Sequence, residues 1–194
     1  MGLKLITAPA VEPVLLADVK AQLGIPTADT AHDDVITRRI TEAREWAEIY
    51  TNRAFITQTV ELALDAFPAA EIDLPRGPVT GITSVKYLDD SQMEQTLDAA
   101  TYTLDDYGPQ PWLLPAYGQD WPTTLDAANA VKIRYVCGYG GTGASVPGPI
   151  KEAILLTVGH WMNFQPGVES GVSITRIPYA VECLLSPYRL YTFG

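Results

Sequence analysis

The spacing of hydrophobic residues predicts two helices in the N-terminal part of the chain. Hydrophobic side chains recur every three or four positions over residues 15–23, and Gly24 stands where a left-handed residue would end such a helix. A longer stripe of the same period predicts a second helix from about Asp34 to Thr51, with Asp33 or Asp34 as its N-cap and Asn52 as its terminator. The chain before both helices, Leu3–Val14, carries two prolines and is predicted to be extended.

From Phe55 onward the hydrophobic period changes from helical to alternating. Val60, Leu62 and Leu64 share one face of a segment whose other face is Thr59, Glu61 and Ala63, which predicts a strand. Further predicted strands, separated by turns rich in Pro, Gly and Asp, are 71–74, 82–88, 95–97, 101–104, 112–114 and 131–136. Short strands joined by such turns indicate an antiparallel sheet or a small sandwich inserted between helices.

A third helix is predicted to begin near Ile150, after a loop rich in Gly and Pro. Its hydrophobic residues cover more than one narrow stripe, and its only charges are Lys151 and Glu152. Such a helix must be buried on two sides, either in the core or against another subunit. The last segment, from Pro178 to Leu190, is predicted to form a short helix or a turn-rich arm broken by Pro187.

These elements predict one α+β domain over residues 1–194. Its body would consist of the two N-terminal helices, the long apolar helix and the short C-terminal helix. An antiparallel, β-rich and acidic region, residues 55–136, would be inserted into that body.

The charge of the chain disfavours a protein that grips nucleic acid. There are 13 Lys plus Arg against 23 Asp plus Glu, a formal net charge of −10, which is the wrong sign for binding phosphates. Residues 61–126 hold twelve acidic and two basic residues, and the rest of the chain is balanced. This region is either a well-solvated β region with acidic turns or a face that must not adhere to a polyanion.

The sequence shows no pattern typical of a catalytic, metal or cofactor site. His32 precedes a predicted helix and His160 lies in the apolar third helix, where structural roles are expected. Cys137 and Cys183 are far apart in sequence and have apolar neighbours, so both are predicted to be buried free thiols. No membrane span or secretion signal is expected.

One segment, Gly138–Gly143, matches the GxGxxG pattern of dinucleotide-binding folds. In those folds a helix begins at once after the third glycine and holds the pyrophosphate at its N-terminus. Here residues 144–149, with two prolines, precede the helix, and no second βαβ unit follows. We therefore interpret the segment as a flexible loop between sheet and helix, with nucleotide binding as a remote alternative.

The order of several short motifs resembles a known family. These motifs are Glu12-Pro13-Val14, Ala17-Asp18-Val19-Lys20, Tyr50-Thr51-Asn52-Arg53-Ala54, Thr57-Gln58-Thr59, Leu74-Pro75-Arg76-Gly77-Pro78-Val79, Tyr135-Val136-Cys137-Gly138-Tyr139-Gly140 and Leu184-Leu185-Ser186-Pro187-Tyr188-Arg189. Together they resemble the head-tail connector, or adaptor, proteins of long-tailed bacteriophages and related gene-transfer agents. The resemblance runs from about Glu12 to Arg189.

The resemblance implies a structural protein of the virion, made in the host bacterial cytoplasm and located at the head-tail interface. Such adaptors form a ring, usually dodecameric, that docks beneath the portal protein, extends the DNA channel and offers a platform for a stopper or tail-side connector. DNA would pass through without sequence-specific binding, and no catalytic residue, metal, cofactor or membrane would be involved. The residues that would contact the portal or a neighbouring subunit are Trp161, Leu184, Leu185, Tyr188 and Arg189.

Two features differ from the usual pattern of that family. Leu15 stands where Thr or Ser would cap the first helix, and only five residues follow Arg189, so a long portal-inserting arm is not expected. Another tail-completion or assembly scaffold protein remains the alternative.

Overall fold

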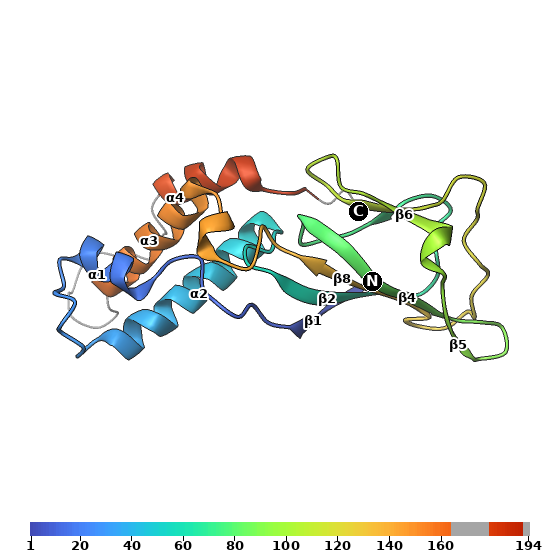
Figure 1. Cartoon of the computed structure of the whole chain (residues 1–194), viewed down its shortest axis with the longest axis horizontal. Helices are drawn as coiled ribbons and strands as arrows, with labels where there is room; N and C mark the ends of the chain where they lie inside the picture. The colour runs from blue at the N-terminus through green and yellow to red at the C-terminus, as the bar shows by residue number, and fades with distance from the viewer. Residues whose placement is uncertain (164–178, 192–194) are drawn as a thin grey trace, which may run out of the picture.

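The computed structural model describes residues 1–163 and 179–191 of the protein. In these residues four helices gather at one end of an elongated molecule, and two antiparallel sheets form the other end (Figure 1). The fold is therefore α+β, as the sequence predicts.

The helices lie close to their predicted positions. They are α1 (Leu16–Leu23), α2 (Asp33–Thr51), α3 (Gly148–Asn163) and α4 (Tyr179–Leu185). Gly24 and Asn52 have φ of 69° and 53°, so both helices end in the left-handed residue that the sequence predicts. Pro178, where the C-terminal segment was predicted to start, lies outside the described residues.

The N-termini of α1 and α2 differ from expectation. Leu15 offers no capping oxygen, but the Asp18 carboxylate accepts the Leu15 N–H at 3.1 Å, so half of a capping box remains. The prediction that Asp33 or Asp34 caps α2 is wrong: His32 occupies the N-cap position, and Asp33 is already helical. The Asp33 carboxylate instead pairs with the buried Lys20 ammonium at 2.6 Å, which ties α1 to α2.

Eight strands form the two sheets. The five-stranded sheet has the order β1-β2-β8-β4-β5 and the three-stranded sheet has the order β3-β7-β6. Their bounds are β1 (Gly2–Thr7), β2 (Gln58–Leu64), β3 (Ile72–Asp73), β4 (Val79–Leu88), β5 (Glu94–Thr96), β6 (Tyr102–Asp105), β7 (Trp112–Pro115) and β8 (Val131–Cys137). β1 was expected only as extended chain; it joins the sheet from outside the predicted β region by pairing with β2.

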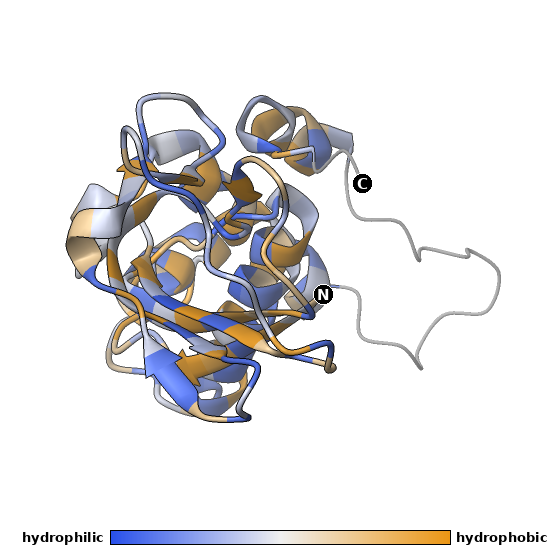
Figure 2. Cartoon of the chain, turned by 90° about the vertical axis from the view of Figure 1, so that its right-hand side faces the viewer, coloured by the Kyte–Doolittle hydropathy of each residue, from blue (hydrophilic) through white to orange (hydrophobic). Residues whose placement is uncertain are grey.

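The alternating pattern of the central strands accounts for how the sheets bury their hydrophobic residues. Along β8 every second residue from Val131 to Cys137 is buried, and β2 pairs with it in register from Gln58↔Cys137 to Leu64↔Val131. Figure 2 shows the resulting alternation of hydrophobic and hydrophilic residues along the strands. Residues of both sheets, among them Ile133 of β8 and Leu113 of β7, close one hydrophobic core.

A second core lies between the helices. It contains the apolar faces of α1, α2, α3 and α4, and Phe55 and Ile56 belong to it, whereas Ala54 belongs to the core of the sheets. The segment 54–56 therefore connects the two cores directly after α2. On α3, Ile150, Ile154 and Val158 are fully buried, while Leu155, Leu156, Trp161 and Met162 are only partly buried.

The two cysteines have different environments. Cys137 is buried at the end of β8, as predicted, and burial raises the pKa of its thiol to about 12. Cys183 is exposed on α4, so the prediction that both thiols are buried is wrong for this residue. α4 is a short amphipathic helix, and the apolar neighbours of Cys183 in sequence turn toward the core while Cys183 faces solvent.

Candidate functional site

The C-terminal segment lies across the C-terminal end of α2. The Leu190 N–H donates to the Thr51 carbonyl at 2.9 Å, and the Arg53 side chain donates to the Tyr188 carbonyl. These contacts fix the short turn after α4 against the body. The segment that the family resemblance assigns to an interface is thus held in place by one backbone hydrogen bond and one from the Arg53 side chain.

Arg189 is exposed and is held between aromatic rings. Its guanidinium lies 5.1 Å from the ring centroids of both Tyr50 and Tyr191, and Tyr50 in turn stacks on Trp46 at 5.4 Å. We call these four residues the Arg189 cluster. Arginine and aromatic residues are enriched at the energetic centres of protein interfaces, so the cluster is a candidate contact surface.

The other sequence-predicted interface residues do not join this cluster. Trp161 lies under the Arg39 guanidinium at 5.9 Å, and Arg39 is about 16 Å from Tyr50 along α2. Leu185 is fully buried in the helical core, whereas Leu184 and Tyr188 are partly buried against it. The structure therefore assigns Leu185 a core position, because α4 turns this side chain inward.

A buried polar network lies where the helical body meets the sheets. Arg44 on α2 donates to Glu12 at 2.8 Å and to Glu48 at 2.9 Å. Glu48 also accepts the Phe55 N–H at 2.8 Å and the Gln58 amide at 3.0 Å. The network connects the N-terminal segment, α2, the segment after α2 and β2.

Burial and charge act in opposite directions on this network. Burial raises the pKa of Glu48, and the Phe55 N–H and Arg44 offset this only in part, so the pKa stays above its ordinary value. Burial lowers the pKa of Arg44, but Glu48 and Glu12 outweigh it and leave that pKa raised. The arginine therefore carries its charge, with carboxylates on two sides.

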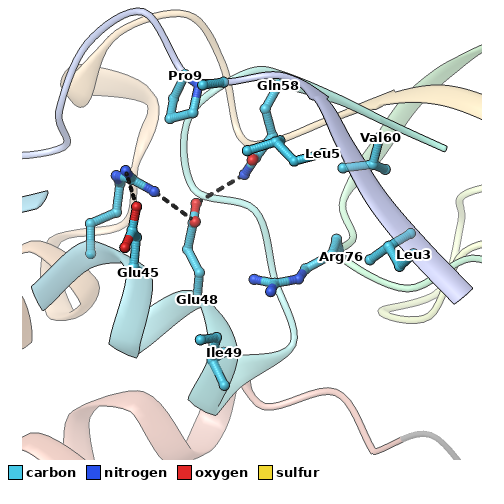
Figure 3. Close-up of a pocket in the computed structure, with 11 residues that line it drawn as sticks. Leu3, Leu5, Pro9, Glu45, Glu48, Ile49, Gln58, Val60 and Arg76 are labelled. Atoms are coloured by element: carbon cyan, nitrogen blue, oxygen red, sulfur yellow. Dashed lines mark hydrogen bonds and ion pairs between the residues drawn. The ribbon is translucent and has the colours of Figure 1, made fainter. Parts of the chain in front are cut away.

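A pocket of about 330 Å³ opens beside this network, between β1 and α2. Figure 3 shows Leu3 and Leu5 of β1 on one side, Ile49 of α2 on another, and the Arg76 side chain pointing between them. Arg76 forms no ion pair within the part of the chain that the structure describes. The pocket thus combines apolar walls with the polar side chains of Arg44, Glu45, Glu48, Gln58 and Arg76.

The glycine loop 138–143 is packed against backbone and does not form a nucleotide site. A Cβ on Gly138, whose φ is 123°, would meet the Ile56 carbonyl oxygen at 2.5 Å. The Gly138 N–H donates to the Pro78 carbonyl, and the Gly140 carbonyl accepts the Thr57 N–H. β8 is antiparallel to both its neighbours, and a short 3₁₀ turn precedes α3. The loop joins sheet to helix as predicted, but it is not flexible, because close backbone contacts fix it.

Among the described residues, the titratable side chains do not form a metal-binding cluster. Within residues 1–163 and 179–191, no group of three or more His, Cys, Asp or Glu is placed to hold a metal ion. His32 is exposed beside α2, and His160 is half-buried on α3. Over the same residues, no helix is long and apolar enough to cross a membrane.

One family model matches the part of the chain that includes α1, α2 and the first strands after them. Residues 14–85 match the model described as Phage gp6-like head-tail connector protein. This segment is therefore similar to the head-tail connector proteins that the model describes. The matched segment includes α1, α2 and the polar network except Glu12, which lies just before it. Among curated proteins, none matches the sequence.

Solved structures with the same fold cover the whole chain. A chain from the neck of an empty gene transfer agent (GTA) particle, with C6 symmetry, has a TM-score of 0.82 at 21% identity, covering 100% of this chain and 98% of that one. A chain from the virion of a native GTA particle has a TM-score of 0.81 at 23% identity with the same coverage. A chain from a native GTA neck with C12 symmetry has a TM-score of 0.72 at 22% identity, again with the same coverage. At this identity the likeness establishes the fold.

Sequence reasoning missed the polar network and the pocket. Arg44 and Glu48 are four residues apart on the buried side of α2, and this spacing was the available signal. The sequence contains no comparable signal for the pocket. Leu3, Ile49 and Arg76 are far apart along the chain, and Leu3 reaches the other two because β1 pairs with β2.

Proposed function

We propose that this protein is a structural head-tail adaptor of a virion or gene-transfer agent. It docks as a ring beneath the portal, extends the DNA channel and provides the platform for the next connector or stopper. The observation that carries this proposal is the full-length likeness to GTA neck chains, together with the match of residues 14–85 to the connector model. A catalytic role is not part of the proposal.

The symmetry of the related particles supports a ring. The necks that contain the similar chains have C6 and C12 symmetry, which is compatible with six or twelve copies around an axis. A ring also explains why Leu155, Leu156, Trp161 and Met162 on α3 are only partly covered in one copy. We propose twelve copies, as in the dodecameric rings that the family resemblance implies.

The Arg189 cluster is the surface that we assign to the portal. Its guanidinium is already positioned by Tyr50 and Tyr191, so binding would cost little side-chain entropy. Leu184 and Tyr188 border the same segment, and Leu185 supports it from the core. Trp161 is assigned instead to the contact between neighbouring subunits.

Light scattering of the purified protein, alone and mixed with its cognate portal, tests the proposal. We expect a discrete complex whose mass corresponds to one portal and one ring of this chain. Arg189→Ala should weaken that complex by about tenfold, because an interface arginine is lost. The matched control is Arg38→Ala, an exposed arginine elsewhere on the helical body, which should leave it unchanged.

Two results would overturn the proposal. Absence of any portal complex, with binding to tail components instead, would indicate another tail-completion protein. A thermal shift with NAD or ATP would support nucleotide binding by the glycine loop. Its close packing, however, leaves a phosphate little room.

A further inference from the structure

The edge strand β1 is held to the molecule almost entirely by its pairing with β2. All six of its residues are exposed, and neither hydrophobic core of the described residues includes any of them. Leu3 and Leu5 line the pocket of about 330 Å³ instead of a packed interior (Figure 3). β1 can therefore leave the sheet without opening a core, at the cost of its pairing with β2.

The chain that follows β1 is anchored from Glu12 onward. The Glu12 carboxylate accepts the Thr41 hydroxyl at 2.9 Å and the Arg44 Nε–H at 2.8 Å. Before this anchor, no backbone hydrogen bond ties residues 8–11 to the body that the structure describes. Pro9 has no N–H and biases this linker toward an extended conformation. β1 is thus a strand on a short extended linker in front of a fixed anchor.

The edge of β2 beneath β1 has a demonstrated partner, which is the sequence of β1 itself. The two strands pair in register from Gly2↔Ala63 to Leu5↔Val60. A second copy carries the identical strand, so its β1 forms the same pairs at this edge. Exchange of an identical element between copies costs little, because each contact that is lost within one copy is regained between two.

The exposed apolar residues of β1 favour the exchanged arrangement. Met1 is 73% exposed and Leu5 is 51% exposed, and Leu3 and Ile6 are exposed as well. In a single copy these side chains remain in water, which is unfavourable for a run of apolar residues. An exchanged β1 lies between two bodies, where the neighbouring copy covers part of this surface. In a ring, each copy donates one strand and accepts one.

We propose that in the assembled ring β1 of each copy pairs with β2 of the neighbouring copy. In the free copy β1 pairs with its own β2, as in the present structure. The linker 8–11 spans at most about 14 Å when extended, so neighbours must bring Glu12 of one copy within that reach of β2 of the next. This proposal rests on the ring of the proposed function and names the link between its subunits.

An engineered disulfide between β1 and β2 tests the exchange directly. Gly2 and Ala63 lie opposite each other, and a Cβ on Gly2 meets nothing within 4 Å. In a Cys183→Ser background, Gly2→Cys with Ala63→Cys is oxidised in rings bound to portal. A non-reducing denaturing gel should then show covalent multimers. Single chains alone, from rings that bind portal, would overturn the exchange and leave the adaptor function intact.

The matched control is Ala63→Cys with Lys132→Cys in the same background. These two positions pair between β2 and β8, which stay within one chain in either arrangement. This variant should therefore give cross-linked single chains and no multimers. Multimers from the control at the level of the test pair would show random oxidation between copies and would overturn the assignment.

Copies that each carry one cysteine make the test independent of bonds within a chain. Copies with Gly2→Cys alone and copies with Ala63→Cys alone, mixed before assembly on portal, should form a mixed disulfide. Copies with Lys132→Cys in place of Gly2→Cys should form none, because β2 and β8 remain together. Absence of the mixed disulfide in rings that bind portal would contradict the exchange.

The same cysteine pair also locks the strand. When Gly2→Cys with Ala63→Cys is oxidised in the free protein, β1 is closed onto its own β2. Ring formation on portal, measured by light scattering, should then fall about tenfold or more and return on reduction, because the exchange-competent state is removed. Equal assembly of the locked and the reduced protein would overturn the exchange. A protein that neither self-associates nor binds portal in either redox state would overturn both proposals.

Discussion

At the scale of single residues, the main finding is a set of charges placed inside the molecule. Arg44 is 5% exposed and Glu48 is 4% exposed, yet both are paired and hydrogen-bonded. Buried charges are costly unless their partners are complete, so each member depends on the others. The Phe55 N–H and the Gln58 amide would lose their common acceptor if Glu48 were removed.

Glu48→Ala should therefore lower the free energy of unfolding by about 3 kcal/mol, as expected when one partner of a buried ion pair is lost. Glu45→Ala is the matched control, because Glu45 contacts the same Arg44 at 3.6 Å but is 61% exposed. Its cost should stay below about 0.5 kcal/mol. Urea denaturation of both variants measures the difference, and equal losses would contradict the assigned role of Glu48.

At the scale of elements, the junctions between helices and sheets depend on close backbone approach. The glycine loop runs beside the segment 54–56, with the Tyr139 N–H donating to the Phe55 carbonyl at 3.1 Å. Gly143 similarly approaches the Pro13 carbonyl, where a Cβ would lie 2.5 Å from the oxygen. These glycines let one strand, one helix and the N-terminal segment meet without side chains between them.

Gly138→Ala should destabilise the protein by about 3 kcal/mol, because it combines a left-handed φ with a collision against the Ile56 carbonyl. Gly141→Ala is the control, since a Cβ there meets nothing within 4 Å. That variant should stay within about 0.5 kcal/mol of the natural protein. Thermal unfolding of the pair tests the assignment, which fails if Gly138→Ala is neutral.

At the scale of the whole molecule, the charge is divided between the two ends. Residues 61–126, which include most of the sheets, carry a balance of −10, and the remainder is neutral. The basic residues of the central strands are themselves paired, Arg134 with Glu61 and Lys86 with Glu94. Like charge prevents adhesion to phosphates, which is compatible with the DNA channel of the proposed function.

The protein should therefore bind duplex DNA only weakly, with a dissociation constant above about 10⁻⁴ M even at low salt. Fluorescence anisotropy of a labelled duplex at increasing salt measures this. Tight binding that weakens steeply with salt would show a cationic surface and contradict the channel role. If the protein were a scaffold elsewhere in the particle, the negative charge of residues 61–126 would need another explanation.

The helices and most strands could be predicted because their information is local. The stripe on α2, the left-handed residues Gly24 and Asn52, and the alternation on β2 and β8 each act within one element. The sequence order of the motifs also led to the connector family. Predictions failed where a neighbouring element intervened: Asp33 pairs with Lys20 and does not cap α2, and Cys183 on α4 faces solvent.

What the sequence alone determined is therefore the α+β class, the position of the helices, the acidic β region and the resemblance to head-tail connectors. Only the tertiary structure decided that Gly2–Thr7 becomes an edge strand, that Arg44 and Glu48 are buried together, and that Arg189 lies between two tyrosines. The physical reason is the separation along the chain between the residues that interact. Periodicity and capping act over a few residues, whereas strand pairing and burial depend on partners far apart along the chain.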